Sequence, residues 1–139
     1  MMRPWSILAA VILSVAVAGL VSACSSKTDP EPPAPLEITQ DENGTTQDVQ
    51  IGQDVRIALD ASPTTGYQWG VIGQVPAQLE RIGEPQFTPA SDAIGAKGTE
   101  VWTFVARSAG EGSLKMKYWR SFEPTVPALA KFRVVLRVK

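Results

Sequence analysis

The fold is decided by the stretch Val55–Val71, which reads VRIALDASPTTGYQWGV. Its two halves place apolar residues at every second position, and a loop without that period separates them. The apolar faces consist of Val55, Ile57 and Leu59 before the loop, and of Tyr67, Trp69 and Val71 after it. Such alternation is typical of a β-strand with one buried face. The stretch therefore predicts a strand, a loop and a second strand.

The loop Ser62–Tyr67 is stiff by composition. Pro63 fixes its own φ, Gly66 permits a positive φ, and the hydroxyls of Thr64 and Thr65 can bond the nearby backbone. Firm loops that protrude from a rigid scaffold carry binding function in many proteins. An ordinary turn between two strands is the alternative for this loop taken alone.

The same period of two continues on both sides and covers Leu36–Lys139. Further strands are expected near Leu36–Gln40, Thr45–Ile51, Leu79–Phe87, Thr99–Arg107, Leu114–Trp119 and Phe132–Val138. Asn43-Gly44 is a strong hairpin signal, so the first two of these strands are expected to pair with each other. About seven or eight short strands predict an all-β fold, an antiparallel β-sandwich. Trp69 and Trp102 are expected in its core, and Phe122 is expected in an exposed loop.

Three loops are expected at the same end of the sandwich, because alternate connections of such a fold emerge together. They are Ser62–Gly66, Ile94–Gly98 and Arg120–Pro127. The second contains glycines that allow close backbone approach to a partner. The third contributes an arginine and an aromatic side chain, residue types that dominate binding hot spots. Together the loops predict one contact edge.

The composition excludes several classes of chemistry. The 139 residues contain no histidine and a single cysteine, Cys24, so the most frequent general base is missing and no intrachain disulfide can form. Acidic residues show no metal-ligand spacing, so neither a metal nor another cofactor is expected. The net charge of −1 argues against a nucleic-acid partner, which requires a basic face. The nearest approach to an enzyme would be Thr64 activated by Lys97, and we expect no enzyme.

The N-terminus has the pattern of an export signal. After a basic start, Ile7–Leu20 is almost wholly apolar, and small residues lead into Cys24. This predicts a lipoprotein signal peptide over 1–23 with Cys24 acylated; the alternative is an uncleaved membrane anchor. Residues 24–35, rich in proline, are expected to form an extended tether, and 36–139 a single domain. The domain would then lie outside the cytoplasm, anchored to the cell membrane by the lipid.

Three motifs occur in the order found in a known family. Ser62–Tyr67, followed by Trp69, resembles the family's Asn-Pro-Thr-Thr-Gly-(Tyr/Phe) loop and its nearby tryptophan. Gly95–Gly98 runs into a strand that contains Trp102, like the family's glycine-rich second loop. Arg120–Glu123, Arg-Ser-Phe-Glu, is similar to the family's Arg-Pro-Trp-Glu. On these motifs the whole domain resembles the chagasin-like inhibitors of papain-family cysteine proteases, which have an immunoglobulin-like fold.

The resemblance implies a reversible, tight-binding inhibitor that blocks the active-site cleft of a papain-family cysteine protease with three loops. Thr64 would lie closest to the protease's catalytic residues, the second loop would line one side of the cleft, and Arg120 and Phe122 would clamp the other. The implied protease-contacting residues are Pro63, Thr64, Thr65, Gly66, Tyr67, Gly95, Ala96, Lys97, Gly98, Arg120, Ser121, Phe122 and Glu123. A monomer is expected.

The chain departs from the family's motifs at three places. Ser62 replaces asparagine, Lys97 interrupts the glycine-rich loop, and Ser121-Phe122 replaces Pro-Trp. These differences bear on potency and target choice more than on fold. A second hypothesis stays open, because immunoglobulin-like folds host many functions. It is an envelope-anchored adhesion or interaction module that uses any face of the domain.

Overall fold

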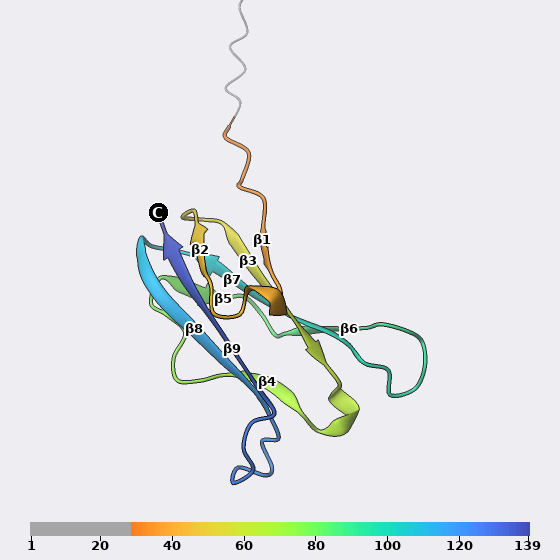
Figure 1. Cartoon of the computed structure of the whole chain (residues 1–139). Helices are drawn as coiled ribbons and strands as arrows, with labels where there is room; N and C mark the ends of the chain where they lie inside the picture. The colour runs from red at the N-terminus through yellow and green to blue at the C-terminus, as the bar shows by residue number, and fades with distance from the viewer. Residues whose placement is uncertain (1–28) are drawn as a thin grey trace, which may run out of the picture.

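The computed structural model describes residues 29–139, which form two stacked β-sheets (Figure 1). The strands are β1 Leu36–Ile38, β2 Thr46–Val49, β3 Asp54–Ala61, β4 Gln68–Val71, β5 Leu79–Arg81, β6 Gln86–Pro89, β7 Gly98–Ala106, β8 Gly110–Trp119 and β9 Ala130–Val138. Two 3₁₀ turns, η1 Gln40–Glu42 and η2 Pro63–Thr65, are the only helical turns in this range. The predicted signal peptide 1–23 and the acylation site Cys24 lie outside the described residues.

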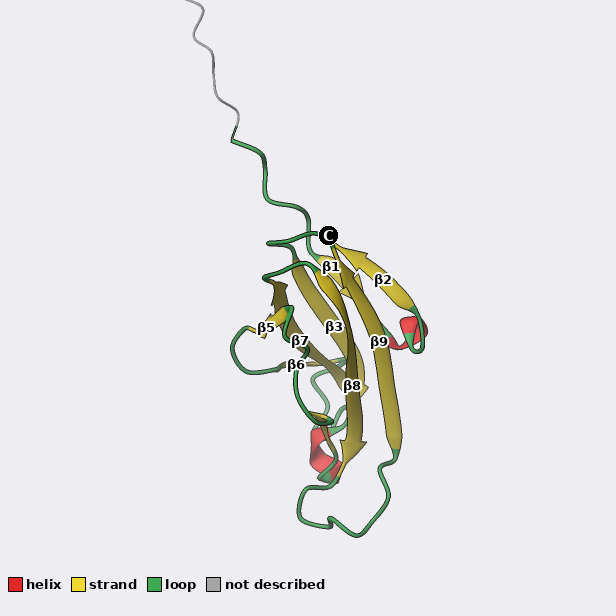
Figure 2. Ribbon diagram, turned by 90° about the vertical axis from the view of Figure 1, so that its left-hand side faces the viewer, coloured by secondary structure: helices red, strands yellow, loops and turns green. Residues whose placement is uncertain are grey.

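The predicted immunoglobulin-like β-sandwich is confirmed. One sheet has the strand order β1-β3-β7-β5, with β6 also paired to β7, and the other has the order β2-β9-β8-β4. Figure 2 shows the second sheet from the side, with β2, β9 and β8 next to one another. Residues 29–139 contain nine strands, because the irregular segment Leu79–Phe87 divides into β5 and β6, which pair with different parts of β7.

The predicted hairpin at Asn43-Gly44 is wrong. β1 pairs in parallel with β3, and β2 pairs in parallel with β9, so the two strands belong to different sheets. Between them the chain forms η1, capped by Thr39, and Gly44 takes a positive φ of 84°. Asn43 Oδ1 accepts a hydrogen bond from Arg133 N (2.9 Å), and Gly44 N donates to Arg133 O (2.6 Å). The Asn-Gly pair therefore fastens a crossing between the two sheets.

The core lies between the sheets and follows the alternation of apolar residues. Trp69 and Trp102 are only 4% and 5% exposed, as expected. The largest side chains without solvent contact include Phe104, Ile57, Leu59, Leu114 and Met116. Every buried apolar residue in the described range lies between Ile38 and Val138, so residues 29–35 contribute no buried side chain to this core.

Two hydrogen bonds join the two sheets at the residues directly before η2. Trp69 Nε1 donates to Asp60 O (2.9 Å), and Tyr118 Oη accepts from Ser62 N (2.8 Å). The Tyr118 ring also packs against Trp69 and Tyr67, with centroid distances of 5.1 and 5.4 Å. Because Asp60 and Ser62 continue the first sheet and both rings belong to the second, the start of the first loop is held by both layers.

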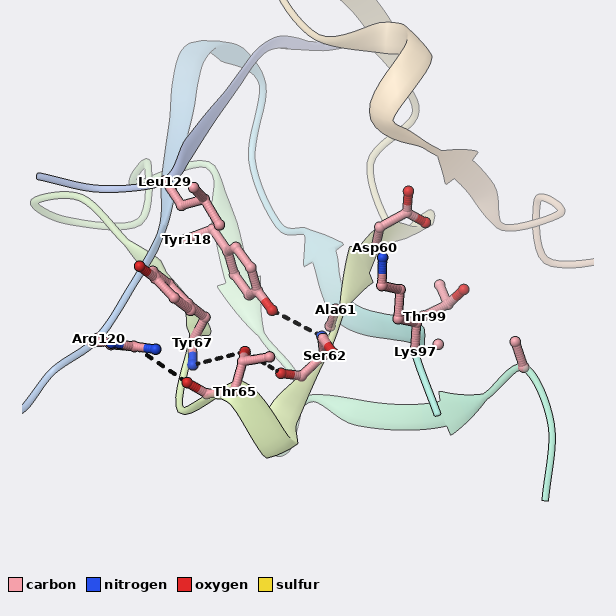
Figure 3. Close-up of a pocket in the computed structure, with 12 residues that line it drawn as sticks. Asp60, Ala61, Ser62, Thr65, Tyr67, Lys97, Thr99, Tyr118, Arg120 and Leu129 are labelled. Carbon is pink, nitrogen blue, oxygen red and sulfur yellow. Dashed lines mark hydrogen bonds between the residues drawn. The ribbon is translucent and has the colours of Figure 1, made fainter. Parts of the chain in front are cut away.

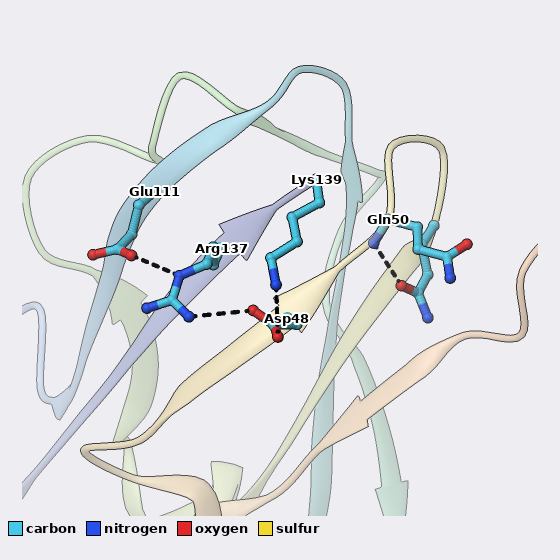
Figure 4. Close-up of polar contacts among 6 residues, drawn as sticks. Asp48, Gln50, Glu111, Arg137 and Lys139 are labelled. Atoms are coloured by element: carbon cyan, nitrogen blue, oxygen red, sulfur yellow. Dashed lines mark hydrogen bonds and ion pairs between the residues drawn. The ribbon is translucent and has the colours of Figure 1, made fainter.

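A row of ion pairs crosses the outer face of the second sheet (Figure 4). Arg137 on β9 bonds Glu111 on β8 (Nε to Oε2, 3.0 Å) and approaches Asp48 on β2 (3.6 Å). Lys139 also reaches Asp48 (3.1 Å). These side chains are about half exposed, so each pair contributes at most about 1 kcal/mol. The row links β2 to its sheet at the end of the domain far from η2.

Replacing Gly98 by alanine is expected to destabilise the domain by about 1–3 kcal/mol, the usual cost of overpacking. A Cβ on Gly98 would overlap Thr88 O and lie 2.7 Å from Pro89 Cα, because β6 and β7 run close together there. Urea unfolding measures the loss. The double variant with Phe87→Ala is the control, since Phe87 Cζ is a further clash at 2.8 Å but its removal leaves the backbone overlap. If Gly98→Ala costs no stability when it is added to Phe87→Ala, this explanation is contradicted.

Glu100 carries a half-buried carboxyl near the edge of the core. Its Oε1 accepts a hydrogen bond from Trp102 Nε1 (2.7 Å), and the Arg81 guanidinium lies over the same indole at 4.5 Å. Burial raises the pKa of Glu100 above the ordinary carboxyl value of 4.5, and the bond from Trp102 opposes that rise. The folded chain therefore holds this proton more tightly than the unfolded chain.

Replacing Glu100 by glutamine is expected to stabilise the domain at pH 7 and to have little effect below pH 4.5. A raised carboxyl pKa favours folding below the ordinary value and opposes it once the pH rises through the raised value. The neutral amide removes that cost and still offers Trp102 an acceptor. Urea unfolding at both pH values gives the difference, with Glu31→Gln in the exposed tether as control. A gain that is the same at both pH values would rule out this cause.

Candidate functional site

The three loops that were predicted to share one end of the sandwich do so (Figure 1). They connect β3 to β4, β6 to β7 and β8 to β9. A Cβ on Gly95 would lie 3.7 Å from Thr64 Oγ1, and one on Gly66 would lie 3.0 Å from the Phe122 ring. The first loop therefore lies in the middle and touches both others. We call residues 62–67, 94–98 and 120–123 the three-loop edge.

The first loop is a closed turn that bonds to itself. Pro63 occupies the first position of η2, and Gly66 ends the turn with a φ of 78°. Thr65 donates to Ser62 O through both its backbone N (3.1 Å) and Oγ1 (2.6 Å), and Gly66 N donates to Pro63 O (3.0 Å). The Ser62 side chain makes no capping bond, so its hydroxyl does not brace the turn. Pro63, Thr64 and Thr65 remain exposed at the tip.

The third loop supports the first through Arg120. Its Nε donates to Thr65 O (3.2 Å), and its guanidinium lies 4.5 Å from the centre of the Tyr67 ring. Glu123 forms an ion pair with the same guanidinium (Nη1 to Oε2, 3.1 Å). Phe122 is 66% exposed while one edge of its ring covers Gly66. The ion pair with Glu123 thus orients the Arg120 side chain toward the first loop.

The second loop closes the hairpin between β6 and β7. Ala90 N donates to Lys97 O (2.9 Å), and Ala96 N donates to Ala93 O (3.1 Å). Gly95 has a φ of 77°, a backbone conformation that residues with a side chain rarely adopt, and it faces Thr64. Lys97 is exposed, and Ala96 is partly covered. The loop therefore presents backbone and small residues toward the first loop.

Two contributors to this end of the domain were not predicted from the sequence. Leu129 after the third loop is 65% exposed, and Ile94, which the predicted second loop already included, is fully exposed. The available signal for Leu129 was a large apolar residue directly after a loop that contains prolines. Tyr118 was placed only on a strand face, yet its hydroxyl also bonds Ser62, 56 positions away. No local pattern could have indicated that bond.

A hollow of about 670 Å³ lies behind the first loop (Figure 3). Its walls include the rings of Tyr67 and Tyr118 and the cationic side chains of Lys97 and Arg120. Thr65 borders it from the side of the loop. On this side the first loop is supported by its own turn, by the hydrogen bonds at Ser62 and Thr65, and by the contact of Tyr67 with Tyr118.

The arrangement offers contact surface rather than reactive groups. Within residues 29–139, no three His, Cys, Asp or Glu side chains gather as a metal site. Glu111 and Glu123 are each paired with an arginine, at opposite ends of the domain. Thr64, the conceivable nucleophile, faces the backbone of Gly95.

Comparisons with known proteins agree with this architecture. Residues 48–136 match the sequence model of the chagasin family peptidase inhibitor I42. Chagasin of Trypanosoma cruzi is 30% identical over 105 residues, which cover 73% of this chain and 96% of chagasin. The crystal structure of the cysteine protease inhibitor EhICP2 from Entamoeba histolytica has a TM-score of 0.65 at 17% identity, over 76% of this chain and 96% of that one. PbICP-C, solved in complex with falcipain-2, has a TM-score of 0.50 at 17% identity, over 76% and 92% of the two chains.

The two solved structures support the fold assignment, and the sequence match supports the family assignment. That match spans most of the domain, from β2 to β9, and includes all three loops. The named relatives are inhibitors and not enzymes. The chain therefore belongs to the chagasin family of peptidase inhibitors.

Proposed function

We propose that the domain inhibits papain-like cysteine proteases reversibly by filling the active-site cleft with the three-loop edge. The observation that carries this proposal is the contact of the first loop with both others, through Thr64 beside Gly95 and Gly66 beneath Phe122. Loops that are shaped before contact lose less conformational entropy on binding. An adhesion module has no need for three loops joined into one narrow edge, so this clustering favours the inhibitor.

The first loop supplies the wedge. Thr64 is exposed at its tip and enters the cleft first, with Thr65 behind it. Pro63 and Gly66 set the backbone of the turn, so the wedge holds one conformation. A peptide bond held away from in-line attack by the catalytic thiolate is not cleaved, because reaction requires a near-attack geometry.

The flanking loops grip the two walls of the cleft. The second loop offers its backbone for strand-like pairing and Ile94 for apolar contact. Phe122 offers an exposed ring on the opposite side. Exposed apolar residues grouped on one surface mark interaction sites in soluble proteins. The arrangement therefore matches a groove with walls on both sides.

The direct test is inhibition of papain by the mature chain made soluble with Cys24→Ser. Papain cleavage of a fluorogenic substrate is followed while the inhibitor is titrated, and activity is measured again after dilution. We expect inhibition at nanomolar to micromolar concentrations that reverses on dilution, with the inhibitor left intact. A folded chain that does not slow papain at micromolar concentration would overturn the proposal.

Replacing Arg120 by alanine is expected to weaken inhibition of papain about tenfold, or ~1.4 kcal/mol. The change removes the bond to Thr65 O and the stacking on Tyr67, so the first loop loses its main external support. Titration of both proteins against papain gives the ratio. Arg56→Ala is the matched control, since Arg56 is paired with Glu37 on the outer face of the first sheet. Equal loss in the two variants would show that the support from Arg120 is unimportant.

We also propose that the mature chain is a lipoprotein, acylated at Cys24 and held outside the cytoplasm by its lipid. The support is the apolar run that ends in small residues and cysteine, followed by a proline-rich tether. Within residues 29–139, no helix is both long and apolar enough to cross a membrane. Labelling of cells with a palmitate analogue should mark the wild type and not Cys24→Ser. An unlabelled wild type that keeps its full N-terminus would favour the uncleaved anchor.

A further inference from the structure

The chain enters the domain at the pole opposite the three-loop edge. Leu36 in β1 is paired with Val55 at the beginning of β3, whereas the first loop follows Ala61 at the end of β3. The last strand finishes at the same pole, where Val138 is paired with Gly110. Figures 1 and 2 both show residues 29–35 and the C-terminus at one end and the loops at the other. We call residues 34–36, 50–53 and 139 the tether pole.

Two hydrogen bonds hold the exit of the tether at this pole. Gln53 Nε2 donates to Ala34 O (2.7 Å), so the last residues of the tether lie against the turn between β2 and β3. Gly52 N in that turn donates to Ala106 O at the end of β7 (2.7 Å). The point at which the tether leaves is therefore fixed to the body of the sandwich.

We propose that this geometry presents the three-loop edge away from the membrane, so that the anchored protein captures proteases arriving from the aqueous side. The inference rests on the proposed function, that is, on protease inhibition and on the lipid at Cys24. It adds the class of partner: a protease free in the surrounding medium, rather than one whose active site is held close to the same membrane.

The lengths of the domain and the tether support this orientation. β8 runs from the tether pole to the edge and spans roughly 30 Å at ~3.4 Å per residue. Residues 24–35 span about 37 Å as a proline-rich chain in the polyproline II conformation. A protease domain of about 200 residues is roughly 40 Å across. Turning the edge toward the membrane with such a protease in between would need about 70 Å of tether, nearly twice the available length.

The test anchors the chain to phosphatidylcholine vesicles at three different points and measures inhibition of free papain. The first sample is the acylated chain itself. The other two start from the Cys24→Ser chain and couple a new cysteine to a maleimide lipid. One cysteine is added after Lys139 at the tether pole, and the other is Thr125→Cys in the connection between β8 and β9. Each coupled chain is compared with its own uncoupled form and the acylated chain with the Cys24→Ser chain, so effects of a substitution itself cancel.

We expect both chains anchored at the tether pole to keep inhibition constants within about threefold of their soluble forms. Anchoring through Thr125 should weaken inhibition at least about tenfold, because the membrane then blocks the edge. Papain tethered to the same vesicles by a short linker should escape the acylated chain.

The outcomes separate the two proposals. Equal inhibition from all three anchoring points, or loss in the acylated chain while the soluble chain still inhibits, overturns the orientation and leaves the proposed function standing. Inhibition of the vesicle-bound papain by the acylated chain also overturns it. If the soluble Cys24→Ser chain fails to inhibit papain, the proposed function fails and the inference falls with it.

Discussion

Replacing Thr64 by arginine is expected to raise the inhibition constant for papain at least about 100-fold, or ~2.7 kcal/mol of binding free energy. Thr64 lies at the exposed tip of the first loop, in the middle of the three-loop edge. An arginine there brings a charge that must lose its water in the cleft without a partner, and such burial is costly. The larger side chain would also crowd Gly95, because even a Cβ placed on Gly95 would lie only 3.7 Å from Thr64 Oγ1.

The matched control for this variant is Thr46→Arg. Thr46 is an exposed residue of β2, which is the edge strand of the second sheet on the side away from β4. It lies outside the three loops. That substitution should leave the inhibition constant within about threefold of the wild-type value, since surface changes away from an interface are nearly neutral. Circular dichroism establishes that both variants are folded. A folded Thr64→Arg chain that inhibits as well as Thr46→Arg would remove the first loop from its role as wedge.

Replacing Phe104 by alanine is expected to lower the free energy of unfolding by about 3–5 kcal/mol. The Phe104 ring has no solvent contact and lies in β7, which pairs with β3, β5 and β6. Truncation loses the transfer free energy of the ring and leaves a cavity, because the close-packed surroundings relax only partly. Each kcal/mol corresponds to about 4–8 °C in the unfolding temperature of a domain of this size. Urea and thermal unfolding both report the change.

Phe87→Ala provides a comparison of the same chemistry at the surface. Phe87 in β6 is 37% exposed and belongs to the margin of the first sheet. Its truncation is expected to cost less than about 1.5 kcal/mol, because part of the ring is already in water. Should Phe104→Ala lose no more stability than Phe87→Ala, the sandwich interior would be less tightly packed than its burial indicates.

Local chemistry was sufficient to predict the strand faces and the shape of the first loop. Val55, Ile57 and Leu59 alternate in the sequence and are all fully buried. Pro63 and Gly66 predicted a stiff turn, and the chain forms a 3₁₀ turn that begins with this proline and ends with this glycine in a left-handed conformation. In both cases the cause lies within a few residues of its effect.

Contacts between distant residues were not predictable in the same way. Asn43-Gly44 has the composition of a hairpin, but its side chain and backbone bond to Arg133, 90 positions away, and the flanking strands join different sheets. Likewise, the bond from Arg120 to Thr65 spans 55 positions, and only the folded chain brings Phe122 over Gly66. The family resemblance indicated that these loops act together, whereas their contacts depend on how the two sheets stack.

The sequence by itself determined which side of each strand is buried, how the first loop turns, and which family the three motifs resemble. Only the tertiary structure decided that β1 and β2 take parallel partners, that the first loop touches both others, and that the tether leaves from the opposite pole. The reason is physical. A period of two sets the direction of each side chain locally, whereas strand partners and loop contacts depend on loop closure and on packing between residues far apart in the chain.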